Sequence, residues 1–182
     1  MNKTSGPVLK LLPFTEDDFT PLISWLPSRE AVAIWGGPSI PFPLTAAELH
    51  HHLEDTQGTH PLRHCWTLHH PHKGDIGHVQ LACDWQNRVG RIGKVIIAPE
   101  VRGQGFAHPL IDLVLAHAFR VDGMERVELN VYPFNTPAIH TYEAHGFIHE
   151  GTRRASALVG DQRWDTMIMG ILEKEWAALH QE

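Results

Sequence analysis

Apolar residues recur with a helical period in the first third of the chain. A short strand over 8–12 is followed by a predicted helix from Thr15 to Leu26 and a second short helix over 29–35. The segment Thr45-Ala-Ala-Glu48 is a capping box, which satisfies backbone donors at the start of a helix. It predicts a third helix over 46–56.

From residue 64 onward the period changes to that of strands. Val127, Leu129 and Val131 alternate with polar residues, as expected for a strand with one buried face. Helical segments separate the later strands, so the order predicts an α/β fold whose sheet contains one parallel crossover. The elements predicted here are strands over 64–69, 76–85, 91–98 and 126–132, helices over 107–121 and 137–144, a hairpin of 148–157 and 163–172, and a terminal helix over 173–181.

The composition indicates one globular domain. Of the 182 residues, 42% are hydrophobic and 20% are charged, so the chain can bury a core. No run reaches the roughly 18 apolar residues that span a bilayer, and residues 1–12 have no secretory pattern. Two cysteines, Cys65 and Cys83, cannot form a disulfide framework. We therefore expect a cytoplasmic protein without a membrane partner, and the net charge of -6 argues against nucleic-acid binding.

The segment Arg102-Gly-Gln-Gly-Phe-Ala107 lies between a predicted strand and a predicted helix. Two glycines allow several backbone N–H groups to face one point, and the N-terminus of the helix adds further donors. The amides from Gln104 to His108 are therefore expected to bind an anion, with Arg102 adding positive charge. The segment lacks the Gly-Lys-Ser or Gly-Lys-Thr of nucleotide triphosphatases, and His108 stands where a dinucleotide-binding loop needs a small residue. A tight turn without a ligand is the alternative.

A second motif follows about thirty residues later. It reads Asn135-x-x-Ala138-x-x-x-Tyr142-x-x-x-Gly146-Phe147. Together with the Arg-x-x-Gly-x-Ala loop, it resembles the GNAT superfamily of acetyl-CoA-dependent N-acetyltransferases. The hairpin around Gly160-Asp161 looks like the branch of ribosomal-protein and small-amine acetyltransferases. The resemblance covers the cofactor motifs in 90–172, within a single N-acetyltransferase domain over 1–182 that ends in a helix or tail over 173–182.

The resemblance implies a mixed, mostly antiparallel sheet flanked by helices, whose central strands splay apart around acetyl-CoA. Backbone groups of the strand before the loop would bind the pantetheine arm, the loop would hold the pyrophosphate, and Asn135 would contact the cofactor arm. The cofactor-binding residues implied in this way are Ile96, Ile97, Ala98, Arg102, Gly103, Gln104, Gly105, Phe106, Ala107 and Asn135. Asn135 and Tyr142 also fall on one helical stripe by spacing alone.

Acylation of an amine requires donors for the oxyanion and a proton for the leaving thiolate. The resemblance places Tyr142 beside the thioester sulfur, where its hydroxyl is a candidate general acid; the alternative is a core tyrosine. A backbone N–H at Ile97 or Ala98 is the candidate oxyanion donor. Glu128 is the first candidate for the base, although a solvated strand carboxylate is the simpler interpretation. Its rivals are Asp84, His78, His140 and a water chain.

Two further groups of residues bear on the site. Trp35, before Gly36-Gly37-Pro38, is expected with Asp84 to face the acceptor, because the family builds the acceptor wall from the early helices. The 15 histidines include His50-His51-His52, but adjacent helical residues point about 100 degrees apart and cannot share one metal well. His64, His69, His70 and His72 lie near a turn and could share a metal only by chance. We therefore expect no metal.

The sequence predicts an N-acetyltransferase that uses acetyl-CoA as cosubstrate. The acceptor is a primary amine of a small molecule or a protein N-terminus, and the protein is a monomer or a homodimer. The alternatives are an acyltransferase for a longer acyl-CoA, a non-catalytic acyl-CoA-binding or regulatory domain, and a histidine-based metal binder.

Overall fold

The structure is a computed structural model that describes residues 8–180. The ends of the predicted domain and the last residue of the predicted terminal helix lie outside this range. The elements in chain order are β1 (Lys10–Pro13), η1 (Glu16–Asp18), α1 (Phe19–Ser24), α2 (Arg29–Gly36), α3 (Ala46–Glu54), β2 (Arg63–His70), β3 (Gly74–Asp84), β4 (Val89–Ile97), η2 (Pro99–Val101), α4 (Ala107–Arg120), β5 (Arg126–Val131), α5 (Thr136–Ala144), β6 (Ile148–Val159), β7 (Gln162–Leu172) and α6 (Glu173–Leu179).

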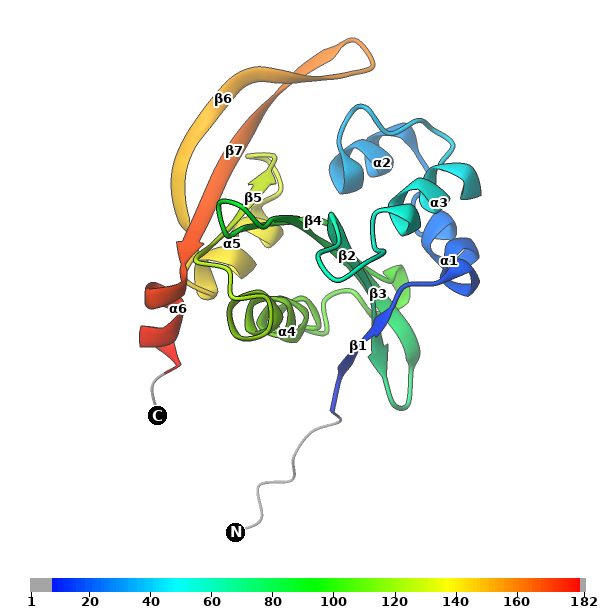
Figure 1. The fold of residues 1–182 in the computed structure, drawn as a ribbon. Helices are drawn as coiled ribbons and strands as arrows, with labels where there is room; N and C mark the ends of the chain where they lie inside the picture. The colour runs from blue at the N-terminus through cyan, green and yellow to red at the C-terminus, as the bar shows by residue number, and fades with distance from the viewer. Residues whose placement is uncertain (1–7, 181–182) are drawn as a thin grey trace.

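All seven strands join one sheet in the order β1-β2-β3-β4-β5-β7-β6 (Figure 1). The pair β4 and β5 is parallel, and the other five pairs are antiparallel. A parallel pair needs a crossover, and α4 supplies it. The predicted mixed sheet with one parallel crossover is thus confirmed.

The two central strands separate after a short pairing. Val89 to Ile92 on β4 pair with Arg126 to Leu129 on β5, and the pairing ends there. One residue later β4 bulges against β3, because Gln80 pairs with Gly93 whereas His78 pairs with Ile96. Lys94 occupies the bulge with a positive φ of 52°. A bulge bends its strand and increases the local twist, so β4 turns away from β5.

Consecutive residues of β2 and β3 are buried, so both faces of the sheet are covered, and helices provide this cover. On one face, α4 buries its apolar stripe against the central strands, with Leu110, Ile111, Val114 and Leu115 fully buried. On the other face, α3 lies against β2, where the Cys65 thiol donates to the backbone oxygen of His52 over 3.8 Å. The long β6–β7 hairpin arches away from the sheet beside α2 (Figure 1). The opening between β4 and β5 is therefore walled by α2, α5 and this hairpin.

Half of the capping box predicted at Thr45 is present in the structure, namely the bond that the Thr45 side chain accepts. The Thr45 side chain accepts from the backbone N–H of Glu48 at 3.4 Å, and α3 begins at the next residue. None of the helices in residues 8–180 has the length and apolar character that a membrane crossing requires.

Candidate active site

A cavity of about 440 Å³ lies where β4 and β5 separate. Its lining comes from α2, the start of β2, β3, β4, β5, α5 and the β6–β7 hairpin. Among the predicted site residues it contains Trp35, Asn135 and Tyr142. These three are distant in sequence, and the divergence of the two strands brings them to one space.

Tyr142 reaches the cavity from the second turn of α5. Pro137 in the first turn of that helix suits a position whose N–H needs no partner. The Tyr142 side chain is 7% exposed, and its ring packs edge-on against Phe147 with centroids 5.7 Å apart. Within residues 8–180 its hydroxyl has no hydrogen-bond partner. Burial raises the pKa of Tyr142 to about 12, so the hydroxyl keeps its proton at neutral pH.

Asn135 precedes α5 as its N-cap and also lines the cavity. Its backbone N–H donates to the Tyr132 oxygen at 2.9 Å, which fixes the turn from β5 into the helix. Tyr132 is the second tyrosine of the cavity, and the sequence did not single it out. It stacks on Phe134 with ring centroids 5.5 Å apart and contacts Trp164 of β7.

The glycine-rich loop leads into α4 and is exposed. Gly103 and Gly105 adopt positive φ values of 76° and 82°, which only glycine adopts without strain. The amides of residues 104–107 have no backbone acceptor within the described residues, whereas that of His108 donates to the Gly105 oxygen at 3.2 Å. The expectation for His108 was therefore wrong, because its N–H closes the turn. Arg102 donates from Nε to the Ile97 oxygen at 3.0 Å and ties the loop to β4.

Successive backbone N–H groups of a strand point to opposite edges, so the two predicted oxyanion donors, Ile97 and Ala98, differ in whether they are already hydrogen-bonded. The Ala98 N–H donates to the Ile76 oxygen at 2.9 Å, so it is not free to stabilise an oxyanion. In an antiparallel pair the neighbouring residue directs its N–H to the opposite edge. Ile97 therefore faces the edge where β5 has separated, and it remains a candidate donor. Ile96 pairs with His78 on β3, and Val95 lines the cavity itself.

Glu128 does not line the cavity, and two arginines hold it. Arg91 stands directly opposite it in the β4–β5 register and donates from Nε at 2.9 Å, and Arg126 donates from Nε at 3.2 Å. Partial burial raises the pKa of Glu128, but the two guanidinium groups outweigh this and lower it. A carboxylate held in this way is a weak base, so the geometry argues against the predicted role.

The rival bases are also absent from the cavity lining. Asp84 caps the β3–β4 turn, where it accepts from the Asn87 backbone at 3.0 Å and from its amide at 2.8 Å. It therefore does not face an acceptor as predicted. His78 is 1% exposed, and burial together with His52 lowers its pKa to about 3. His140 is exposed on α5. Within residues 8–180, the cavity lining contains no carboxylate and no imidazole.

Trp35 is placed as the sequence predicted, in the cavity wall. Its indole Nε1 donates to the backbone oxygen of Lys94 at 2.8 Å, so it also supports the bulge of β4. Behind it, Gln80 donates to His52 Nδ1 at 3.2 Å and to His78 Nε2 at 3.1 Å. The Gln80 oxygen accepts from Arg63 at 3.0 Å. This buried polar network was not predicted, because its members come from three separate elements.

A mixed sheet that opens between two parallel strands, beside a glycine-rich helix N-terminus, is the architecture that the two motifs imply for N-acetyltransferases. Residues 9–148 match the family described as "Acetyltransferase (GNAT) domain". The chain therefore belongs to the GNAT acetyltransferase family.

Individual relatives agree with this assignment. The spermidine N(1)-acetyltransferase of Vibrio cholerae is 34% identical over 83 residues, which are 46% of this chain and 48% of that protein. An uncharacterised N-acetyltransferase of Bacillus subtilis is 32% identical over 99 residues, which are 54% of this chain and 55% of that protein. The chain thus spans about half the length of the curated relatives it matches.

A solved structure matches nearly the whole chain. The crystal structure of spermidine N-acetyltransferase from Vibrio cholerae in complex with CoA and spermine superposes with a TM-score of 0.79. It is 25% identical and covers 93% of this chain and 98% of that chain. These names do not support the predicted likeness to ribosomal-protein acetyltransferases.

Proposed function

We propose that this protein transfers an acetyl group from acetyl-CoA to a primary amine of a small molecule. The observation that carries the proposal is Tyr142, a buried residue in the lining of the cavity where β4 and β5 separate, whose raised pKa keeps its hydroxyl protonated. Support comes from the family and from the similar structure, which is described with CoA. The names of the relatives concern small amines and not a protein N-terminus.

The residues fit acetyl-CoA on two sides of the opening. The free amides of residues 104–107 and the positive end of α4 suit its pyrophosphate. The free edge of β4 at Ile97 suits the amide groups of the pantetheine arm, and Asn135 lies in the cavity beyond it. This arrangement directs the thioester toward Tyr142.

The reaction follows from these positions. The amine nitrogen attacks the thioester carbon, a C–N bond forms, and the C–S bond breaks. A backbone N–H of β4 stabilises the oxyanion, and Tyr142 gives its proton to the leaving thiolate. Because the described cavity lining holds no carboxylate or imidazole, water takes the proton that the amine loses. The thioester already carries the activation, so the transfer needs no metal.

The test is the release of free CoA, followed with a thiol reagent, in the presence of acetyl-CoA and a panel of small amines. The proposal expects release that depends on both substrates and yields the N-acetyl product. Binding of acetyl-CoA without release by any amine would instead favour the non-catalytic acyl-CoA-binding domain. Replacing acetyl-CoA with butanoyl-CoA tests the longer-acyl alternative, which requires the longer thioester to react faster.

A further inference from the structure

The cavity is lined by basic side chains. Arg63 comes from β2, Arg91 and Lys94 from β4, and Arg153 from β6. No aspartate or glutamate of residues 8–180 shares this lining. An acceptor that enters the cavity therefore meets positive charge on more than one side.

Carboxylates outside the cavity offset two of these four charges. Arg63 lies 2.9 Å from Asp55 through Nε and 2.7 Å through a terminal nitrogen. Arg91 is paired with Glu128, as described above. The charges that remain for a ligand are those of Lys94 and Arg153.

Neither of these two residues has an anionic partner among the described residues. Arg153 donates to the amide oxygen of Asn130 at 3.1 Å, which is an uncharged acceptor. The Lys94 ammonium lies 6.0 Å from the centroid of the Trp35 ring and forms no ion pair. Burial, and after it the charge of Arg63, lowers the pKa of Lys94. Among residues 8–180, the cavity lining thus holds no negative charge that balances Lys94 and Arg153.

We propose that the acceptor is an amine that carries an anionic group, such as a carboxylate, and that Lys94 and Arg153 bind this group. This inference rests on the N-acetyltransferase function proposed above. A polyamine would bring additional ammonium groups next to uncompensated cations, which is unfavourable. The same positive field lowers the pKa of the acceptor's own ammonium. The nitrogen therefore enters more readily in its neutral, nucleophilic form.

Three amines of similar length test the charge preference. They are 4-aminobutyrate, n-butylamine and 1,4-diaminobutane, which differ in a terminal carboxylate, methyl or ammonium group. We expect the highest kcat/KM for the carboxylate and the lowest for the diamine. Turnover that favours the diamine or spermidine would overturn this inference and leave the N-acetyltransferase function standing. No CoA release with any amine would overturn both.

Two charge-removing variants locate the anion. In Lys94→Gln and Arg153→Gln, kcat/KM for 4-aminobutyrate should fall about 10- to 100-fold, the range of a lost charge-assisted hydrogen bond. The value for n-butylamine should fall less, because this amine loses only the effect of the positive field on its ammonium, and KM for acetyl-CoA should stay constant. Lys174→Gln removes an equal charge from the exposed surface of α6 and is the matched control. An equal fall for both amines would show a structural effect and contradict the assignment.

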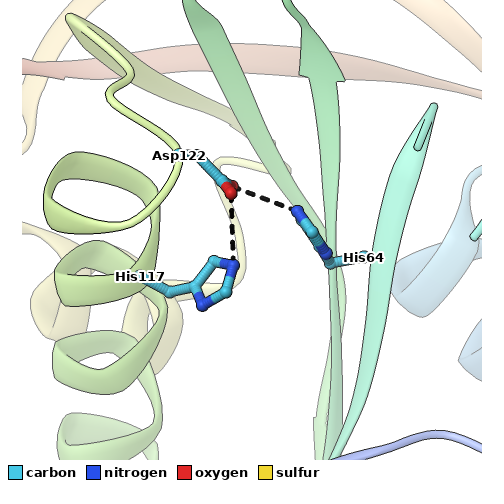
Figure 2. A group of neighbouring side chains, drawn as sticks. All are labelled: His64, His117 and Asp122. Carbon is cyan, nitrogen blue, oxygen red and sulfur yellow. Dashed lines mark ion pairs between the residues drawn. The ribbon is translucent and has the colours of Figure 1, made fainter. Parts of the chain in front are cut away.

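A second inference concerns a different part of the molecule. Figure 2 shows His64 of β2, His117 of α4 and Asp122 of the following loop directed toward one another. The ligand atoms of the three side chains all lie within 4.8 Å of one another. His64 Nε2 is 3.1 Å from Asp122 Oδ2, and His117 Nε2 is 3.3 Å from Oδ1.

These close contacts are ion pairs, and against the effect of burial both imidazoles lower the pKa of Asp122, but their geometry falls short of well-formed hydrogen bonds. Both Nε2 atoms and Asp122 Oδ2 are buried without a hydrogen-bond partner in the described structure, and the Asp122 side chain is only 6% exposed. Leaving a buried polar atom unpaired costs about 1–3 kcal/mol. Atoms that share a metal ion lie about 3 Å apart, and their lone pairs point to a common centre instead of at each other. An ion at that centre would satisfy all three atoms.

The geometry points to a structural site for Zn²⁺ at His64, His117 and Asp122. Two imidazole nitrogens and a carboxylate are a zinc ligand set, and a water completes the tetrahedron. His64 is stacked on Trp66 with ring centroids 4.9 Å apart, which orients its imidazole. The ion would link the end of α4 to β2, away from the cavity, and it takes no part in the transfer.

Metal content and stability test this site in tag-free protein. After treatment with a chelator, added Zn²⁺ should bind one ion per chain and raise Tm, and Co²⁺ should give the visible absorption of a tetrahedral site. His117→Gln and Asp122→Asn should each lose this binding. His51→Gln, at an exposed position of α3, should retain it. Binding that is absent, or equal in all these proteins, would overturn the site and identify the cluster as an ion-pair network.

Discussion

At the residue scale, burial gives Tyr142 the protonation state that its proposed role requires. Burial alone raises its pKa to about 12. A phenol that remains protonated can donate to a developing thiolate, whereas an ionised one cannot. The carboxylate of Glu128 shows the opposite case, since Arg91 and Arg126 keep it ionised and paired.

Tyr142→Phe should therefore lower kcat about 100- to 10,000-fold, the usual contribution of general acid catalysis. The phenylalanine ring keeps the packing against Phe147, so Tm and KM for acetyl-CoA should change little. Steady-state kinetics and thermal unfolding measure both effects. Tyr132→Phe is the informative comparison, because Tyr132 also lines the cavity. If Tyr132→Phe lowers kcat more than Tyr142→Phe does, or if Tyr142→Phe changes kcat only a few-fold, Tyr142 is not the general acid.

At the element scale, the loop before α4 combines a backbone that needs glycine with a helix N-terminus. The turn requires the positive φ of Gly105, and the same turn leaves the N–H groups of residues 104–107 without backbone acceptors. A Cβ atom at Gly105 meets no atom within 4 Å, so we expect a substitution there to affect the ligand and the backbone conformation more than the packing.

A pair of substitutions separates these two effects. Gly105→Asn and Gly105→Asp impose a similar side chain on the same φ, and both residues tolerate this region better than most. Only aspartate places a negative charge where the pyrophosphate should bind. With acetyl-CoA at 100 times its dissociation constant, the wild type should gain about 2.7 kcal/mol of stability. Gly105→Asp should lose this gain, measured as the Tm shift, and Gly105→Asn should keep a larger part of it. Equal shifts in both variants and the wild type would refute the loop assignment.

Local signals account for most of the elements that the sequence predicted. The capping box at Thr45, the glycine loop and the alternation of β5 each depend on residues close in sequence. The local structure of these segments can therefore be predicted without knowledge of the tertiary fold. The length of α3 was overestimated by two residues, because helix ends depend on tertiary contacts as well as on caps. The bulge at Lys94 had no sequence signal, since its positive φ belongs to a residue that rarely adopts it.

At the scale of the whole molecule, the candidate site was predicted only in part. Asn135 and Tyr142 share a helix, so their spacing places them on one face. The cations Arg63, Lys94 and Arg153 meet only because the sheet order and the hairpin bring three strands together. The failure at Glu128 has the same cause: alternation gives the direction of a side chain, but the register that sets Arg91 opposite it depends on long-range pairing.

The final prediction concerns stability against pH and rests on two buried histidines. Burial, assisted by Lys94 for His52 and by His52 for His78, lowers both pKa values from 6.5 to about 3. The folded protein keeps them neutral, whereas the unfolded chain binds protons below pH 6.5. Their contribution to stability is therefore complete above pH 6.5 and is lost as the pH falls toward 3. As the pH falls through this window, each histidine should lower the free energy of unfolding by up to about 1.4 kcal/mol per pH unit.

Urea unfolding between pH 7.5 and 5 measures this slope. His78→Gln removes one of the two groups, so its free energy of unfolding should depend less steeply on pH, even if the variant is less stable at pH 7.5. His140→Gln removes an imidazole at an exposed position of α5 that does not act on His52 or His78, and it should keep the wild-type slope. The carboxylates are common to all three proteins, and their effect cancels in the comparison. Identical slopes for His78→Gln and the wild type would show that His78 is protonated in the folded protein, which would contradict a neutral network around Gln80.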